Sequence, residues 1–319
     1  MMRSKVTVSL FLLTAVAHAP AALAQTEGAP PHAYSAAGAF DPARGLVIFG
    51  GFLRGGYSGD TWEFAGDRWS RSTRPGPSGR NGPAMVYDSS RHQLVLFGGD
   101  TRTTGPLGDT WLRDGEQWRE IVTAGPPARS VFAMTWDSKR SRVVLFGGAG
   151  TAGLLNDTWE WNGAQWSRRA TDGPSARTLH AMAFDPVRGR VVLYGGAAVL
   201  DPEASALDDT WEWDGTTWRE IRVRGPGGRN HHAMHWDPAR RVIVLYGGMG
   251  PGGEHGNETW GYDGTTWRRL PIDGPRRRFP VMALDSRAGS LLLFGGFDDQ
   301  PSSDLFRLGA RGWSLLTPK

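Results

Sequence analysis

One hairpin sequence, present in six copies, restricts the possible folds of this chain more than any other feature. The copy Asp209-Thr-Trp211-Glu-Trp213-Asp214-Gly215-Thr-Thr-Trp218 contains Asp214-Gly215, a dipeptide typical of two-residue turns whose central residues both need a positive φ. A turn centred on this dipeptide places Trp211 directly opposite Trp218, and such aromatic pairs stabilise antiparallel strands. The same pairing is expected in the other copies: Trp62/Trp69, Trp111/Trp118, Trp159/Trp166, Trp260/Trp267 and Phe306/Trp313. Six equivalent hairpins indicate a repeat protein.

Two more strands precede each hairpin. The first holds a methionine and an aromatic residue two positions apart, as in Met182-Ala-Phe184-Asp185, so both lie on one face of a strand. The second is an apolar run that ends in two glycines, as in Gly195-Gly196, and is typical of a strand buried on both faces. The first glycines of successive pairs are 48, 49, 48, 52 and 48 residues apart. Four strands per period of about 50 residues are expected of a propeller blade.

The apolar run, the Gly-Gly pair, the Asp-Thr-Trp strand and the later tryptophan together resemble the kelch motif, repeated six times over residues 32–317. The resemblance is to the propeller family that includes the central domain of galactose oxidase, although many kelch repeats have a longer turn before the last tryptophan. It implies an all-β fold, a six-bladed kelch-type β-propeller with four antiparallel strands per blade, over residues 25–319. The blades are expected at residues 32–72, 80–121, 129–169, 177–221, 229–270 and 278–317.

Blade 1 begins with its own first strand, and blade 6 ends with its own fourth strand. This count leaves no strand for exchange between the two ends of the chain. We therefore predict that side-chain packing between blades 1 and 6 closes the ring.

Residues 1–24 have the pattern of a secretory signal peptide. Arg3 and Lys5 precede an apolar run over residues 6–17, and Ala22-Leu-Ala24 forms a small-residue cleavage site. The run is shorter than the roughly 20 residues needed to span a bilayer, so no membrane insertion is expected. The resemblance and the signal peptide together suggest an exported bacterial protein, periplasmic or secreted, and we expect a monomer.

Composition narrows the possible functions. Cysteine is absent, which excludes disulfides, thiol nucleophiles and thiolate metal sites. The formal net charge of +4 is spread along the chain rather than gathered in a run, so no nucleic-acid partner is expected.

The loops after Gly-Gly and the Gly-Pro segments are expected on one rim of the propeller, where the copies differ most in length. Function tends to lie on variable loops carried by a rigid scaffold. The same rim carries an arginine in Gly-Pro-x-x-Arg, and a guanidinium can bind a carboxylate or phosphate through two hydrogen bonds. The arginines are either a site for an anionic ligand, such as an acidic sugar, or structural residues that pair with carbonyls or an acid of a neighbouring blade. They are Arg80, Arg129, Arg177, Arg229 and Arg278.

Histidines and other residues that break the repeat complete the list of candidates. His180 and His232 both stand three residues after their arginine, which favours a structural or channel-lining role. His231 and His235 share a strand face but stand about 13 Å apart, so we predict no metal site. Further candidates are His231, His235, Arg276, Arg277, Asp201, Glu203, Asp298 and Asp299.

No cofactor is expected. Gly148-Ala-Gly150-Thr-Ala-Gly153 matches the dinucleotide fingerprint, but it leads into another strand rather than into a helix.

The resemblance to kelch propellers suggests three functions. The first is a binding or scaffold module for a protein or glycan, favoured because no catalytic constellation stands out and catalytic residues cannot be assigned. The second is a sugar-acid mutarotase similar to exported bacterial sialic-acid epimerases, with the rim arginines binding the carboxylate. The third is an oxidase similar to galactose oxidase, which is excluded because that cofactor needs a cysteine. The chain is thus expected not to be an enzyme, and the tryptophan hairpins are expected to be scaffold.

Overall fold

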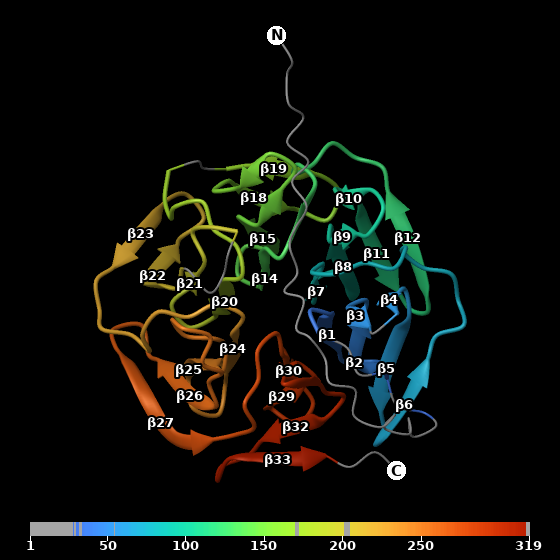
Figure 1. Ribbon diagram of the computed structural model, residues 1–319. Helices are drawn as coiled ribbons and strands as arrows, with labels where there is room; N and C mark the ends of the chain where they lie inside the picture. Colours follow the sequence, from blue (N-terminus) through green and yellow to red (C-terminus); the bar gives the residue numbers. More distant parts are fainter. Residues whose placement is uncertain are drawn as a thin grey trace.

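The computed structural model describes residue 28 and residues 30–31, 34–53, 55–169, 172–200 and 205–316. The predicted signal peptide lies outside the described residues. Six four-stranded antiparallel sheets stand around a common axis as the blades of a propeller (Figure 1). The all-β, six-bladed fold is confirmed. No helix in the described part of the chain is long and apolar enough to cross a membrane.

In each blade the strands follow one another from the axis outward. Blade 1 has β1 (Ala37–Asp41), β2 (Gly45–Phe49), β5 (Thr61–Ala65) and β6 (Arg68–Arg71); blade 2 has β7 (Ala84–Asp88), β8 (Gln93–Phe97), β11 (Thr110–Asp114) and β12 (Gln117–Ile121). Blade 3 has β14 (Ala133–Asp137), β15 (Arg142–Phe146), β18 (Thr158–Trp161) and β19 (Trp166–Arg168); blade 4 has β20 (Ala181–Asp185), β21 (Arg190–Gly196), β22 (Leu207–Trp213) and β23 (Trp218–Ile221). Blade 5 has β24 (Ala233–Asp237), β25 (Val242–Tyr246), β26 (Glu258–Tyr262) and β27 (Trp267–Asp273); blade 6 has β28 (Val281–Asp285), β29 (Ser290–Phe294), β32 (Leu305–Leu308) and β33 (Trp313–Leu316).

Nine short strands lie in the loops at one end of the propeller. They are β3 (Phe52–Leu53), β4 (Gly56–Tyr57), β9 (Asp100–Thr101), β10 (Gly105–Pro106), β13 (Arg129–Ser130), β16 (Ala149–Gly150), β17 (Gly153–Leu154), β30 (Phe297–Asp298) and β31 (Gln300–Pro301).

Each pair of neighbouring blades encloses a hydrophobic core. The second strand of every blade is buried on both faces, as predicted, because alternate side chains point toward the two neighbouring blades. In β15, for example, Val144 packs toward blade 4, whereas Val143 and Leu145 pack toward blade 2. The glycine pair that follows has the predicted role: Gly147 has a φ of 65°, and a Cβ there would lie 2.8 Å from the carbonyl oxygen of Arg177.

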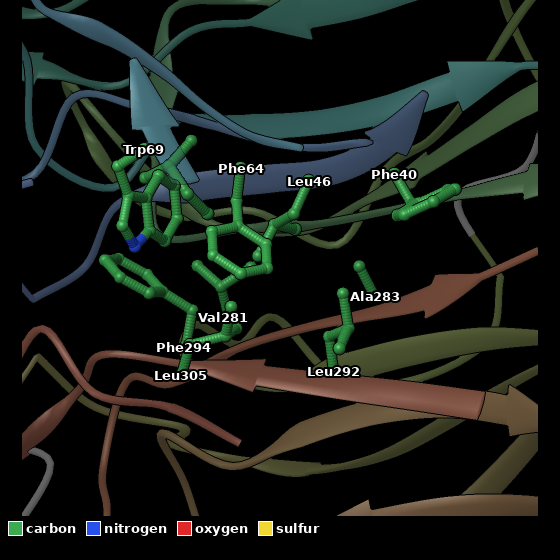
Figure 2. Packing of buried hydrophobic residues seen from close by; sticks show 10 residues of the cluster. Phe40, Leu46, Phe64, Trp69, Val281, Ala283, Leu292, Phe294 and Leu305 are labelled. Atoms are coloured by element: carbon green, nitrogen blue, oxygen red, sulfur yellow. The ribbon is translucent and has the colours of Figure 1, made fainter. Parts of the chain in front are cut away.

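The ring closes by packing between blades 6 and 1, as predicted. Phe294 and Leu305 of blade 6 lie against Phe64 and Trp69 of blade 1 in one buried cluster (Figure 2). Among the described strands, none from one of these blades pairs into the sheet of the other.

The predicted register of the tryptophan hairpin is wrong by two residues. Trp218 lies opposite Trp213, and the partner of Trp211 is Glu220. The carboxylate of Asp214 accepts hydrogen bonds from the backbone N–H groups of Thr216 and Thr217, at 2.8 and 2.9 Å. Asp214 therefore precedes the turn rather than lying at its centre. A shift of two residues keeps each tryptophan on the predicted face of its strand.

The same register recurs in the other hairpins. The residues opposite the fourth-strand tryptophan are Phe64, Arg113, Trp161, Trp213, Tyr262 and Leu308.

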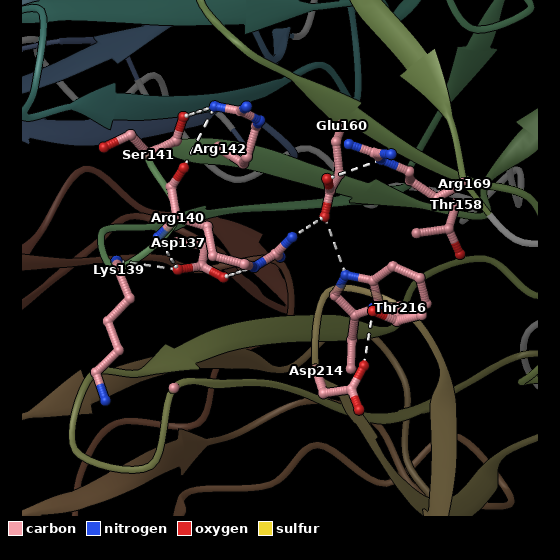
Figure 3. Close-up of polar contacts among 12 residues, drawn as sticks. Asp137, Lys139, Arg140, Ser141, Arg142, Thr158, Glu160, Arg169, Asp214 and Thr216 are labelled. Carbon is pink, nitrogen blue, oxygen red and sulfur yellow. Dashed lines mark hydrogen bonds and ion pairs between the residues drawn. The ribbon is translucent and has the colours of Figure 1, made fainter.

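Buried carboxylates join some of the blades. Glu160 of blade 3 is 1% exposed and accepts a hydrogen bond of 3.1 Å from Trp213 Nε1 of blade 4. Arg140 and Arg169 of its own blade also contact this carboxylate (Figure 3). Glu212 of blade 4 has the equivalent role. Its carboxylate accepts a hydrogen bond of 3.0 Å from the hydroxyl of Tyr262 in blade 5.

Threonine–tryptophan hydrogen bonds join five of the six blade pairs. Trp166 Nε1 of blade 3, for example, donates to Thr110 Oγ1 of blade 2 at 2.9 Å. At the junction of blades 6 and 1, Leu305 takes the threonine position, and the buried Nε1 of Trp69 has no partner. The five bonds are Trp118–Thr61, Trp166–Thr110, Trp218–Thr158, Trp267–Thr210 and Trp313–Thr259.

The substitution Thr110→Val should lower the free energy of unfolding by about 1–3 kcal/mol, because it leaves a buried indole N–H without an acceptor at nearly constant volume. Urea denaturation measures the change. Thr103→Val, in an exposed loop position, is the matched control and should change stability by less than about 0.5 kcal/mol. Equal effects of the two variants would contradict the prediction.

Candidate functional site

The loops after Gly-Gly and the Gly-Pro segments lie together at one end of the propeller, which we call the Gly-Gly rim. In every blade, the residue after the Gly-Gly pair bridges to a residue just before the innermost strand. These bridges are Tyr34–Phe52, Asn81–Asp100, Ser130–Ala149, Thr178–Ala197, Asn230–Met249 and Arg278–Phe297.

Arg129 shows what the repeated arginine does in the structure. Its side chain is 0% exposed, and both terminal nitrogens donate to the carboxylate of Asp157, at 2.7 and 2.9 Å. It also donates to the carbonyl oxygens of Pro127 and Gly147. Its own carbonyl accepts the N–H of Gly99 from the preceding blade at 2.9 Å. The arginine therefore closes its own blade with its side chain and holds the preceding blade with its backbone.

Burial of Asp157 acts to raise its pKa, but the hydrogen bonds and charge of Arg129 outweigh this effect. The result is a carboxyl pKa below its usual value, so the ion pair persists at neutral pH.

Arg80 and Arg177 repeat this arrangement, and Arg229 repeats it with a single hydrogen bond to its acid. The acid lies in the arginine's own blade, not in a neighbouring blade as the structural alternative had it. The pairs are Arg80–Asp109, Arg177–Asp209 and Arg229–Glu258. This geometry supports the structural alternative, because the guanidinium forks are already occupied, and direct contact of these arginines with a ligand stays a prediction.

In blade 6 the equivalent arginine is Arg277, not the predicted Arg278. Arg277 donates to Asp304 at 2.9 Å, and its carbonyl accepts the N–H of Gly248. The Gly-Pro segment of this blade is one residue shorter than in blades 2 to 5, so counting from the proline selects the wrong arginine.

Arg278 instead occupies the bridge position that Asn81, Ser130, Thr178 and Asn230 fill in blades 2 to 5. Its guanidinium carbon lies 4.5 Å from the centroid of the Phe297 ring, and it contacts the sulfur of Met249. The side chain is half-buried, so part of it reaches the surface of the rim.

Five half-buried aromatic residues, of which Phe297 contacts Arg278, pack together at the junction of blades 6 and 1, and we call them the aromatic cluster. The ring centroid of Tyr34 lies 5.1 Å from Phe52, 5.3 Å from Phe297 and 5.7 Å from Phe279. Tyr57 completes the cluster, 5.8 Å from Phe52. Sequence reasoning missed all five. A position-by-position comparison of the repeats would have found Tyr34, because blades 2 to 5 place small polar residues there.

His180 and His232 are buried aromatic rings in the wall of the channel. His180 packs edge-on against Phe146 at 5.5 Å, and His232 against Tyr194 at 5.8 Å. Phe132 makes the same contact in blade 3. Burial, helped by the charge of Arg177, lowers the pKa of His180 to about 3. Burial also lowers the pKa of His232 well below its ordinary value.

The channel narrows at the Gly-Gly rim. One residue of each blade has a φ between 48° and 60° and lines a shallow depression of about 130 Å³. In blades 2 to 6 the backbone N–H of this residue donates a hydrogen bond to the carbonyl of the equivalent residue in the preceding blade. Gly82, for example, donates to Ser35, and Phe279 donates to His231. The six residues are Ser35, Gly82, Val131, Leu179, His231 and Phe279.

The remaining candidates do not form a common site. Asp298 pairs with His255 at 3.0 Å, whereas Arg276 and Asp299 are exposed. His235 lies in the channel wall away from the Gly-Gly rim. Asp201 and Glu203 fall outside the described residues. Within the described ranges, no group of three or more histidine or acidic side chains could hold a metal ion.

Comparisons with known proteins agree with this architecture. A family model described as the KLHDC2/KLHL20/DRC7 Kelch-repeats domain matches residues 65–219. The solved structure of YjhT is similar to this chain with a TM-score of 0.71 and 15% sequence identity, over 91% of this chain and 99% of that one. At this identity the likeness is one of fold alone. No curated protein matches the sequence.

Proposed function

This chain belongs to the kelch-repeat family of β-propellers, and we propose that it is a monomeric binding module that recognises a partner protein at the Gly-Gly rim. Arg278 and the aromatic cluster anchor the partner. We also propose that the N-terminal signal peptide exports the protein to the periplasm or beyond the cell, on the sequence pattern alone.

The observation that carries this proposal is the replacement of small bridge residues by Tyr34 and Arg278 at one junction of the ring. Blades 2 to 5 keep the same backbone bridge with asparagine, serine or threonine, so the scaffold does not require the large side chains. Aromatic residues and arginine are also the residue types that contribute most to protein interfaces.

Charge indicates the chemistry of the partner. Arg278 is half-buried beside aromatic rings, and the neighbouring Arg276 is exposed. A carboxylate on the partner would meet a guanidinium that is partly shielded from water, where an ion pair is stronger than on an open surface. The rim therefore suits a segment with an acidic side chain next to an apolar one.

The mutarotase alternative assigned the rim arginines to a sugar carboxylate. Ion pairs with acids of their own blades take up four of those guanidinium forks, so the structural observations favour a binding module over this enzyme.

The double variant Arg278→Asn/Phe297→Ala tests the proposal with residues that the chain itself uses in other blades, as at Asn81 and Ala149. Affinity capture from an envelope fraction identifies the partner, and calorimetry then measures its dissociation constant. The variant should weaken binding at least about tenfold, the loss expected when interface anchors are truncated.

Val187→Ser, at an exposed position on the opposite rim, is the control and should leave the affinity unchanged. Equal affinity of the double variant and the native chain would contradict the proposal. A glycan array tests the other class of ligand. If the native chain binds a glycan and the double variant does not, the ligand of the rim is a glycan and the proposed partner protein is wrong.

A further inference from the structure

The propeller channel has a second, wider mouth at the end opposite the Gly-Gly rim. Inner strands of all six blades enclose a cavity of about 390 Å³ there, which we call the channel cavity. Small-molecule sites in proteins occupy about 300–1,000 Å³, so the cavity is large enough for a small ligand. The six residues of positive φ line a separate depression at the Gly-Gly rim, so the channel cavity is a distinct site.

The wall of the channel cavity is mainly apolar. Five methionines line it, one from each of blades 2 to 6, together with aromatic residues that include Trp136 and Trp236. Methionine side chains adapt to the shape of what they contact, and indole rings offer flat apolar faces. Such a wall suits an aromatic molecule.

One blade places an imidazole in this wall. His235 of β24 occupies the position between the methionine and the aromatic residue of the inner strand. At this position the six blades have Ala39, Val86, Thr135, Ala183, His235 and Ala283. Alanine fills it in three blades, so packing does not require a histidine.

The orientation of the imidazole determines what it can bind. His235 Nδ1 lies 3.0 Å from the carbonyl oxygen of Trp236. A carbonyl only accepts hydrogen bonds, so Nδ1 carries the proton and Nε2 is an acceptor. No described residue donates to Nε2. His235 is half-buried and lines the cavity, so Nε2 is left as an acceptor for a donor group on a ligand there.

We propose that the channel cavity binds a small aromatic molecule whose hydroxyl or N–H group donates a hydrogen bond to His235 Nε2. The site is independent of the Gly-Gly rim and goes beyond the proposed recognition of a partner protein.

A pair of probes that differ only in the donor tests the role of His235. 2-Naphthol carries a hydroxyl, whereas in 2-methoxynaphthalene the same oxygen is methylated. Calorimetry, with tryptophan fluorescence as a second readout, should show 2-naphthol binding at one site per chain. It should bind about tenfold tighter than 2-methoxynaphthalene, the factor that one hydrogen bond supplies.

His235→Ala should remove this difference and bring the two dissociation constants within about twofold of each other, since the donor loses its acceptor. The variant introduces the residue of blades 1, 4 and 6, so folding should be preserved. Absence of 2-naphthol binding up to its solubility limit, or an unchanged preference for 2-naphthol in the variant, would overturn the proposal.

Two further variants locate the site. Ala183→Val/Ala283→Val places the side chain of blade 2 in two more blades, narrows the cavity and should weaken both probes. Arg278→Asn/Phe297→Ala changes only the Gly-Gly rim and should leave both affinities as they are. If the rim variant weakens the probes and the channel variant does not, the probes bind at the rim and the channel site is refuted.

Discussion

The propeller is expected to lose stability steeply as the pH falls from about 6.5 to about 4, because three histidines are buried in its channel wall. His180, His231 and His232 are each 6% exposed. Burial, together with nearby arginines, lowers the pKa of each of them in the folded state, to about 3 for His180. In the unfolded chain each histidine takes up its proton near its ordinary pKa of 6.5.

The direction follows from proton binding. Between the two pKa values the unfolded state binds more protons than the folded state, so the free energy of unfolding falls as the pH falls. Above pH 6.5 both states are neutral and the effect is absent. Between its unfolded and folded pKa values each histidine contributes a slope of at most about 1.4 kcal/mol per pH unit, so the three together contribute at most about 4 kcal/mol per pH unit. A loss of this size over one pH unit is a large fraction of the roughly 5–15 kcal/mol of stability of a typical domain.

The double variant His180→Phe/His232→Phe should reduce this slope by about half to two thirds, since His231 and His235, whose pKa values burial also lowers, remain. Phe132 fills the same position in blade 3 with the same edge-on contact, so the fold should accept phenylalanine there. Urea denaturation at several pH values between 7 and 4.5 measures the slope. His92→Asn, at an exposed position, is the control and should not change it. An unchanged slope in the double variant would show that the channel histidines do not cause the acid sensitivity.

Arg129→Met should lower the free energy of unfolding by about 3–5 kcal/mol, the loss expected when one partner of a buried ion pair is removed. The substitution leaves Asp157 charged and 5% exposed, and it also removes the donors to the carbonyls of Pro127 and Gly147. Chemical denaturation at pH 7 measures the effect.

A second substitution distinguishes charge from packing. Replacing both partners, as Arg129→Met/Asp157→Leu, should recover part of the loss, because no uncompensated charge remains in the interior. Arg222→Met breaks an exposed ion pair with Glu220 and should cost less than about 1 kcal/mol. If Arg129→Met costs no more than Arg222→Met, the arginine does not hold the blade together.

Both errors of prediction occurred where a motif rule was applied without the hydrogen bonds that the residues make in the structure. A turn rule centred the hairpin on Asp214-Gly215, but hydrogen bonds from Thr216 and Thr217 to the aspartate moved the turn by one position. A motif count selected Arg278, but the contacts of Arg277 with Asp304 and Gly248 determine which arginine closes the blade.

Sequence alone determined the fold: the strand order, the period, the six blades and the packed junction of blades 6 and 1. These features depend on patterns within about 50 residues. Over that length the sequence shows both the apolar residues of each strand and the turn residues between strands. Tertiary structure alone decided which side chains the scaffold holds in ion pairs and which line the rim and the channel cavity. Tyr34 meets Phe297, and His235 lines a cavity with residues of five other blades, only because the ring closes. Contacts between positions so far apart follow from the packing of whole blades, which no local pattern records.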